Sequence, residues 1–308
     1  MAADAPLQLE VPERSAGERL DRFLAEPLGS RARAQQLIDA GHVLVDGRVR
    51  PKRHLVKPGE RIAISEPRAP VMSSEERALE VDVAYEDDYL LVVDKPAGVV
   101  VHPARGHRSG TLAQALSGRA AGGEEPARAG IVHRLDRDTS GLLVVAKSEA
   151  VHRALKAMLA ARRLRREYLA LVEGTPSARS GTIDAPIGRH RRERTLMSID
   201  SEYPRAARTH FEVERFLPEA TFLRVVLETG RTHQIRVHMA AIGHPVAGDS
   251  QYGGARSYGL KRQFLHAARL AFEHPVSHAA VDVHSLLPGD LARALAVAAR
   301  GAAPTLDA

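Results

Sequence analysis

Apolar residues in the first part of the chain follow the spacings of short helices and then of short strands. Two helical segments, 20–24 and 30–41, precede two alternating runs that flank Asp46-Gly47. An Asp-Gly pair in that position is a strong hairpin signal, because both residues tolerate positive φ. Another short strand is expected at 61–65. The pattern predicts a small N-terminal αβ unit.

Periodicity disappears between Pro67 and Glu76, where Pro, Ser and Glu accumulate, and such composition is typical of a linker. We therefore expect an N-terminal domain at residues 1–68, a linker at 69–79, a main domain at 80–300 and a flexible tail at 301–308.

The main domain alternates strand and helix patterns. A compact apolar run at 90–93 and another at 142–146 are expected to form buried strands, and an amphipathic helix is expected at 148–159. Residues 167–173 alternate as a strand that places Tyr168 on one face. Near the end, 291–299 predicts a further amphipathic helix. Thr232 is predicted to cap a helix whose core-facing residues are Ile235, Met239 and Ile242.

Composition narrows the class of protein. The 308 residues are 44% hydrophobic and 27% charged, as in globular proteins, and contain no cysteine. Disulfides, thiolate metal sites and thiol nucleophiles are therefore excluded. No apolar run reaches the roughly 20 residues of a membrane span, and the start lacks the pattern of a secretory leader. We expect a cytoplasmic protein with no membrane contact.

The charge balance favours a polyanionic partner. The formal net charge is +6, and arginines gather in two clusters, at 162–166 and 189–194. A guanidinium group meets two phosphate oxygens at once, which suits nucleic acid. Aromatic residues make up only 4% of the chain and tryptophan is absent, so recognition by many stacking platforms is not expected.

One carboxylate and one arginine are the main candidates for chemistry. Asp136 precedes a turn that leads into the apolar strand at 142–146, which would hold it at the mouth of a sheet. Arg236 lies beside Ile235 on the core-facing helix, where an unpaired charge is costly. Asp136 is the expected partner of Arg236.

Three chemistries fit these residues. A metal site could use His133, His233 and His238, although the five-residue spacing of the last two does not place them on one helix side. Glycosidase-type chemistry would need a second buried acid, for which Asp249 is the candidate. A single Asp beside Arg and Tyr suits attack on a nucleoside without a cofactor.

Long motifs carry a family resemblance. They are DKPAGVVVHP at 94–103, HRLDRDTSGLLVVAKS at 133–148, Arg166-Glu167-Tyr168, TGRTHQIRVH at 229–238 and GHPVAGD at 243–249. From about residue 80 to 290 the chain resembles the RluA family of RNA pseudouridine synthases, and in particular its D-type branch that acts on large-subunit ribosomal RNA. Asp94 departs from the family, which has Asn there.

The N-terminal unit resembles an S4 RNA-binding domain. The likeness rests on RLDRFL at 19–24, Ser30-Arg31, the segment from Leu37 to Gly47, and the segment from Val56 to Ile64. Asp46 stands where family members usually have Asn, a change that a turn tolerates.

The resemblance implies an α+β fold of mixed α/β character. We expect a central, mostly antiparallel mixed sheet flanked by helices, preceded by the small S4-like domain. It also implies an isomerase that converts uridine to pseudouridine without cofactor or metal. The substrate that it suggests is 23S ribosomal RNA, including pre-ribosomal particles, while transfer RNA stays open as an alternative. We further expect a monomer.

The resemblance assigns roles to individual residues. Asp136 would be the carboxylate that severs the C1′–N1 bond, Tyr168 would stack on the base, and Arg236 would pair with Asp136. Arg134 would fill the gap left by the extruded uridine. Further RNA contacts are expected from His133, Arg31, Arg231, Ile235, Arg189 and Arg192. Two other functions remain open: an RNA-binding protein without catalysis, and a nucleoside hydrolase that releases uracil.

Overall fold

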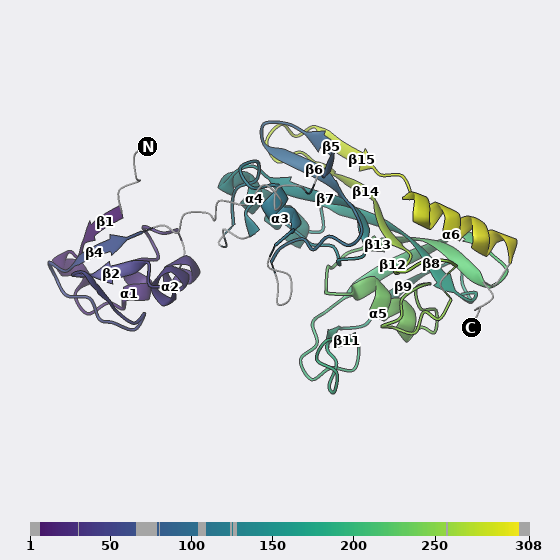
Figure 1. The fold of residues 1–308 in the computed structure, drawn as a ribbon, viewed down its shortest axis with the longest axis horizontal. Coiled ribbons are helices and arrows are strands. Elements are labelled where there is room, and N and C mark those ends of the chain that lie inside the picture. The colour runs from purple at the N-terminus through teal and green to yellow at the C-terminus, as the bar shows by residue number, and fades with distance from the viewer. Residues whose placement is uncertain are drawn as a thin grey trace. The chain divides into compact units, whose positions relative to one another are not determined.

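The structure is a computed structural model that describes residues 7–29, 31–65, 79, 81–103, 109–123, 125, 128–256 and 258–301. The chain divides into two compact units, one N-terminal and one C-terminal, and each is considered by itself (Figure 1). Ser30, most of the predicted linker and residues 302–308 of the predicted tail lie outside the described residues.

The N-terminal unit is a four-stranded sheet with two helices. Its strands lie in the order β1-β4-β2-β3, and every neighbouring pair is antiparallel. The predicted hairpin is confirmed: Asp46 and Gly47 join β2 to β3 with φ of 49° and 75°. The elements are β1 (Leu7–Glu10), a 3₁₀ turn (Glu13–Ser15), α1 (Leu20–Phe23), α2 (Arg31–Asp39), β2 (Val43–Val45), β3 (Arg48–Val49) and β4 (Arg61–Ile64).

A small apolar core holds this unit together. Leu20 and Leu24 from the first helical segment and Ile38 from α2 are buried against Val43 and Ile62 of the sheet. Burying aliphatic side chains of this size contributes about 1.5–3 kcal/mol each. Sheet and helices therefore stabilise each other.

The C-terminal unit is built on a nine-stranded sheet in the order β5-β6-β7-β14-β8-β13-β12-β9, with β15 paired to β14. All neighbouring strands are antiparallel except β7 and β14, so the predicted mostly antiparallel mixed sheet is confirmed. Its strands are β5 (Asp82–Glu86), β6 (Leu90–Lys95), β7 (Ser140–Ala146), β8 (Arg165–Glu173), β9 (Ser180–Asp184), β12 (Arg208–Phe216), β13 (Ala220–Leu227), β14 (Leu265–Glu273) and β15 (Ala280–His284).

In the described part of this unit, four helices accompany the sheet. They are α3 (Leu112–Ala115), α4 (Glu149–Ala160), α5 (Gln234–Ala241) and α6 (Gly289–Arg300). A separate two-stranded hairpin, β10 (Gly188–Arg189) and β11 (Met197–Ser198), projects from the body of the unit (Figure 1). Thr111 caps α3 through a capping box with Gln114.

The middle of the sheet is buried on both faces, which explains the continuous apolar runs in β6 and β7. Leu143 and Val145 of β7 face one core cluster, while Leu142 and Val144 face another. On the second face, α4 packs Leu155 and its apolar neighbours against the sheet, as its predicted amphipathic pattern requires. Packing on both sides fixes the start of β7, and thus the end of the Asp136 loop.

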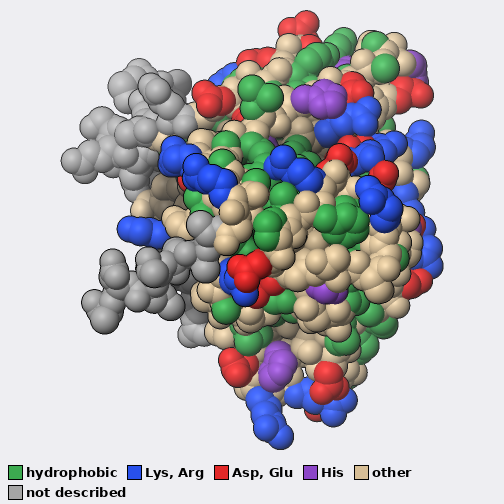
Figure 2. All heavy atoms as spheres, turned by 90° about the vertical axis from the view of Figure 1, so that its right-hand side faces the viewer, with side chains coloured by type: hydrophobic (Ala, Val, Ile, Leu, Met, Phe, Trp, Pro, Cys, Tyr) green, Lys and Arg blue, Asp and Glu red, His purple; other side chains and the backbone are tan. Residues whose placement is uncertain are grey.

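The surface mixes charges of both signs. On the face shown in Figure 2, Lys and Arg side chains lie among Asp and Glu side chains. Ion pairs on the sheet include Arg224 with Glu212 at 2.7 Å and Arg269 with Asp282 at 2.6 Å. Among the described residues, no helix combines the length and the apolarity needed to cross a membrane.

Candidate active site

A cleft of about 720 Å³ opens in the C-terminal unit. Its walls are the loop before β7, the end of α4, the start of β8 and the segment between β13 and α5. The predicted residues that line it are His133, Arg134, Asp136, Tyr168, Arg231 and Ile235. Residues 95 positions apart in sequence thus share one cleft.

Asp136 lies in the loop that precedes β7, and the turn after it is closed by the Thr139 amide, which donates to the Asp136 carbonyl at 3.2 Å. The carboxylate is 17% exposed, with Arg236 Nη1 at 3.5 Å from one oxygen and His233 Nε2 at 4.0 Å from the other. These are ion-pair distances rather than close hydrogen bonds. The carboxylate therefore keeps lone pairs available to a substrate.

Arg236 has a second carboxylate partner besides the predicted Asp136. Its main partner is Asp249, which accepts from Nε at 2.6 Å and from Nη2 at 2.8 Å. Gln251 accepts from Nη2 as well. Asp249 is 2% exposed in the turn after Gly248, so the charges of Arg236 and Asp249 are buried together. The Nε and Nη2 groups of Arg236 are therefore fully used in hydrogen bonds. Asp136 contacts only the remaining Nη1.

Tyr252 and His233 complete the support of Arg236, and sequence reasoning did not foresee either role. The Arg236 guanidinium lies 4.9 Å above the Tyr252 ring, and the Tyr252 hydroxyl bonds His233 Nδ1 at 2.8 Å. Burial lowers the pKa of Arg236, but its ion pair with Asp249 outweighs this and the pKa is raised. Arg236 therefore remains a fixed cation.

His233, and not the predicted Thr232, is the N-cap of α5, with a left-handed φ of 56° and no side-chain cap bond. A left-handed non-glycine residue is a strained position that often accompanies a functional site. Here the strain turns the His233 ring toward Asp136. Ile235 and Met239 are buried as predicted, but Ile242 is 38% exposed because it lies just past the end of the helix.

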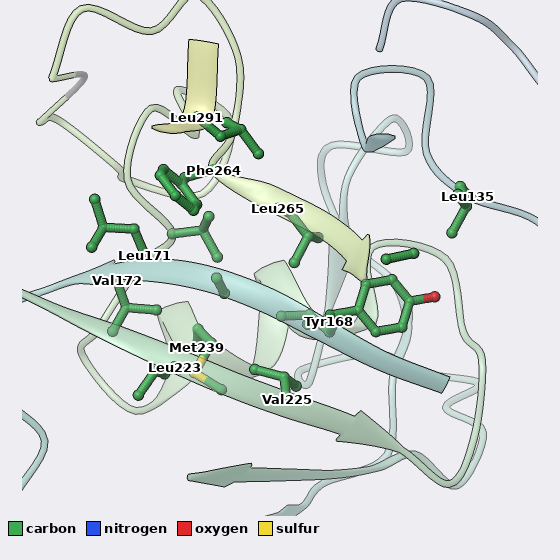
Figure 3. Packing of buried hydrophobic residues seen from close by; sticks show 14 of the residues in the cluster. Leu135, Tyr168, Leu171, Val172, Leu223, Val225, Met239, Phe264, Leu265 and Leu291 are labelled. Atoms are coloured by element: carbon green, nitrogen blue, oxygen red, sulfur yellow. The ribbon is translucent and has the colours of Figure 1, made fainter. Parts of the chain in front are cut away.

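Tyr168 forms the floor of the cleft. Its ring packs at the edge of the main apolar cluster, and its hydroxyl points away from most of the labelled aliphatic side chains, toward the side on which Leu135 lies (Figure 3). Burial raises the pKa of Tyr168, so the side chain is a neutral phenol at pH 7. Such a ring offers one flat face to a base and one polar edge to its substituents.

Lys95 anchors the Asp136 loop. Its position at the end of a strand did not predict this role. The Nζ group is fully buried and donates to the carbonyls of Pro96, Val99 and Arg137 at 2.8, 2.9 and 2.9 Å. Burial lowers its pKa to about 7. One ammonium group thus ties the 96–99 loop to the residue after Asp136.

The three histidines of the metal hypothesis point to different partners. His133 Nε2 accepts from the Val144 amide at 3.3 Å, and His238 bonds Thr209 and the Ala185 carbonyl. In the described part of the chain, no group of three His, Asp or Glu side chains could hold a metal ion. Asp249 is buried as the glycosidase hypothesis needs, but Arg236 neutralises it.

The predicted arginine clusters separate in space. From the first cluster only Arg162 and Arg166 line the cleft, together with Lys156, whereas Arg165 pairs with Glu167 at 2.6 Å. Arg189 and Arg192 lie outside the cleft, on and beside the β10–β11 hairpin. Alternation along β8 places the neighbouring Arg165 and Arg166 on opposite faces of the sheet.

Arg31 lies in the N-terminal unit, on α2. Its guanidinium pairs with the buried Asp21 at 3.0 Å, and 54% of the side chain is exposed. Half of this residue is thus available to a ligand.

Two family models match the chain. One is described as RNA pseudouridylate synthase and matches residues 89–241. The other is the S4 domain, which matches residues 18–62.

Curated relatives match over most of their length. The ribosomal large subunit pseudouridine synthase D of Xanthomonas campestris is 42% identical over 93% of this chain and 90% of its own. The protein of the same name from Pseudomonas aeruginosa is 43% identical, with coverages of 91% and 92%. The uncharacterized RNA pseudouridine synthase YlyB of Bacillus subtilis is 40% identical, with coverages of 93% and 96%.

Solved structures agree with these matches. Human RNA pseudouridylate synthase domain containing 1 superposes with a TM-score of 0.55 at 31% identity, covering 68% of this chain and 84% of that one. Human RNA pseudouridylate synthase domain containing 4 gives a TM-score of 0.54 at 22% identity, covering 70% and 92%, and shows the same fold. With relatives above 40% identity along nearly the whole chain, this protein belongs to the RNA pseudouridylate synthase family.

Proposed function

We propose that this synthase isomerises specific uridines of large-subunit ribosomal RNA, with Asp136 as the catalytic carboxylate. The observation that carries the assignment is the position of Asp136. It lies in a cleft lined by cations, near the paired Arg236 and across from Tyr168. The names of the relatives support the substrate class, since several are ribosomal large subunit synthases.

The reaction rearranges bonds within one nucleotide. The C1′–N1 bond breaks, a C1′–C5 bond forms, and N1 gains a proton while C5 loses one. No electrons are exchanged with a second reactant, so the balance needs no cofactor. An ionised Asp136 could attack C1′, add to the base or remove a sugar proton, and each route uses the lone pairs that Arg236 leaves free.

We assign substrate positioning to Tyr168 and Arg134. The neutral Tyr168 ring would stack on the extruded base, while Arg134, which is exposed at the cleft, would fill the space left in the RNA. Extruding a base costs a few kcal/mol, and both contacts offset that cost. Arg231 and Ile235 would contact the same nucleotide from the other wall.

The N-terminal unit would add affinity for RNA. We propose residues 1–68 as the binding domain, 69–79 as linker, 80–300 as catalytic domain and 301–308 as flexible tail. Arg31 on α2, with Arg189 and Arg192 of the hairpin region, would contact phosphates away from the cleft. We further propose a monomer, acting in the cytoplasm on ribosomal RNA or its precursors. Light scattering after gel filtration tests the monomer.

The decisive experiment maps pseudouridines in ribosomal and transfer RNA from cells that lack this protein. Restoration with the native form, with Asp136→Asn or with Asp138→Asn separates the roles. Asp138 is two residues away in the same loop and pairs with Arg137 at 3.0 Å, so it is a matched control. Native protein and Asp138→Asn should restore the missing sites, whereas Asp136→Asn should not.

Other results would overturn particular parts of the proposal. Restoration by Asp136→Asn would remove that residue from catalysis. If pseudouridines were missing only from transfer RNA, the proposed substrate would be wrong, but the assignment as a pseudouridine synthase would stand. Release of free uracil by the purified protein would indicate a hydrolase, and unchanged RNA of both classes would favour a binding protein without catalysis.

A further inference from the structure

Arg166 is a buried cation with no carboxylate partner among the residues that the structure describes. It is 6% exposed on β8, two residues before Tyr168. Within the described residues its only hydrogen bond is a long one, from Nη2 to the Leu227 carbonyl at 3.4 Å, and its buried Nε has no partner. Removing a guanidinium group from water without pairing it is costly, so such a group calls for an explanation.

His133 presents a second unsatisfied donor on the same cleft wall. Its Nε2 accepts from the Val144 amide, so in the neutral ring the proton must lie on Nδ1. That Nδ1 is buried and has no hydrogen-bond partner. Burial, followed by the charges of Arg166 and Lys156, lowers the pKa of His133 to about 3, and these cations therefore lie near its ring.

The sequence makes room for the Arg166 guanidinium. Gly230 lies in the segment between β13 and α5, and a Cβ built on it would be 2.8 Å from Arg166 Nη1. Its backbone φ is not positive, so no turn requires glycine there. The absence of a side chain at residue 230 keeps the guanidinium group at the cleft surface.

The missing partner should be an acceptor with negative charge. Arg166 and His133 supply donors and no acceptor, while Lys156 and Arg162 on the same wall add positive charge. Two carboxylates line the cleft. Glu228 pairs with Arg162, Arg208 and His210, and Asp136 lies beside Arg236 and His233. A phosphate group of the RNA strand has the charge and the oxygens that these donors lack.

We propose that Arg166 and His133 form a phosphate-binding site for the RNA backbone beside the target uridine. The site rests on the proposed function, since Tyr168 on the same strand face would hold the base. It positions the strand rather than reacting with it. The energetic cost of the unpaired cation in the free protein is recovered when RNA binds.

The test compares Arg166→Met, Arg166→Lys and Gly230→Ala with the native chain. Arg153→Met is the control, because Arg153 is 75% exposed on α4 and outside the cleft. Thermal unfolding is measured in inorganic phosphate and in sodium chloride of equal ionic strength. Binding of single-stranded oligouridylate is measured from low to physiological salt.

Loss of one phosphate contact predicts five results. Arg166→Met should unfold no earlier than the native chain in chloride, since an unpaired buried charge is removed. It should lose the extra stabilisation by phosphate, and its log–log salt slope for RNA should fall by about 0.7. Arg166→Lys should keep the slope. Gly230→Ala should weaken RNA binding by displacing the guanidinium group.

Equal phosphate stabilisation and equal salt slopes for Arg166→Met and native protein would overturn the site. Early unfolding of Arg166→Met with an unchanged slope would do the same, because it would make Arg166 structural. These readouts do not depend on turnover. A native protein that binds phosphate as expected but forms no pseudouridine would refute the proposed function alone.

Discussion

Asp21 and Asp136 both lie beside arginines, but their surroundings differ. Asp21 in the N-terminal unit is fully buried and accepts from Arg19 at 2.9 Å, Arg31 at 3.1 Å and Gln35 at 2.6 Å. Asp136 in the cleft is partly exposed, and its nearest cation is 3.5 Å away. Hydrogen bonds, that from Arg19 first, hold the pKa of Asp21 well below its usual range.

This difference in pairing distinguishes charged groups that stabilise the fold from charged groups that remain available to bind a substrate. Every strong acceptor position of Asp21 is used, so its contribution is to stability. At the cleft the fully paired carboxylate is Asp249, which fixes Arg236, while Asp136 and Arg166 are left with unused capacity. Saturated ion pairs therefore surround the unsaturated groups and position them.

The largest effect is expected from breaking the Arg236 fork. Lysine keeps the charge but cannot bond both Asp249 oxygens and Gln251, so Arg236→Lys should shift the cation relative to Asp136. We expect the single-turnover rate to fall by roughly 10²-fold, since a misplacement near 1 Å has that cost. A rate measurement at saturating RNA tests this.

Arg224→Lys provides the control, because Arg224 pairs with Glu212 and Glu214 on the outer sheet face. Its rate should stay within about two-fold of the native value, as for other surface ion pairs. If Arg236→Lys matched it, the fork would not be needed for catalysis.

Asp21→Asn sharpens the other side of the comparison. It removes the negative charge and replaces one of the two acceptor oxygens by an NH2 group, which cannot accept from the three donors. Because Arg19 and Arg31 are about half exposed, we expect a loss of about 2–3 kcal/mol. Hydrogen exchange in the full chain should show faster opening of α1 and α2, with β7 unchanged. Asp39→Asn, at an exposed pair with Lys52, should cost less than about 1 kcal/mol. Equal losses in the two variants would contradict the distinction.

Lowering the pH should reduce the free energy of unfolding through two histidines that line the cleft. Burial, above all, lowers the pKa of His102 to about 4 and that of His133 to about 3. The unfolded chain binds protons below pH 6.5 that the folded chain does not, so stability falls from pH 6.5 toward 4 and 3. Each histidine contributes a slope of up to about 1.4 kcal/mol per pH unit in that window.

Denaturant unfolding as a function of pH measures this slope. His133→Gln should make it shallower, while His278→Gln, at an exposed position, controls for the loss of a histidine. A slope that is the same in all three proteins would show that His133 is protonated in the fold.

The smallest effect is expected at the hairpin. Arg192 is exposed beside β10 and outside the cleft, so Arg192→Gln should weaken RNA binding about two- to five-fold and lower the salt slope by less than one. Arg293→Gln on α6 is the control. An unchanged affinity would remove the hairpin from the RNA contacts.

Local patterns predicted most elements of the fold. The Asp46-Gly47 hairpin, the amphipathic helix α4 and the buried strand β7 each follow from spacing over a few residues. The pairing of β7 with β14 could not be predicted, because its partners are more than 120 residues apart and no local pattern encodes such a choice.

The candidate site was predictable in part. Asp136, Tyr168 and Arg236 carry the motifs, and the structure brings all three to the cleft region. The role of Asp249 was missed because a Gly-Asp pair also suits a surface turn. Lys95 was missed because a lysine at a strand end is ordinarily exposed, and only the fold shows three carbonyls around it.

The ammonium group of Lys95 has one N–H for each carbonyl that surrounds it. Loss of one proton leaves two hydrogens for three acceptors and turns a lone pair toward an oxygen. With its pKa lowered to about 7, that imbalance arises within the neutral range, among three carbonyls that include that of Arg137, next to Asp136. The alkaline limb of the pH–rate profile would then report on a lysine that never touches the nucleotide.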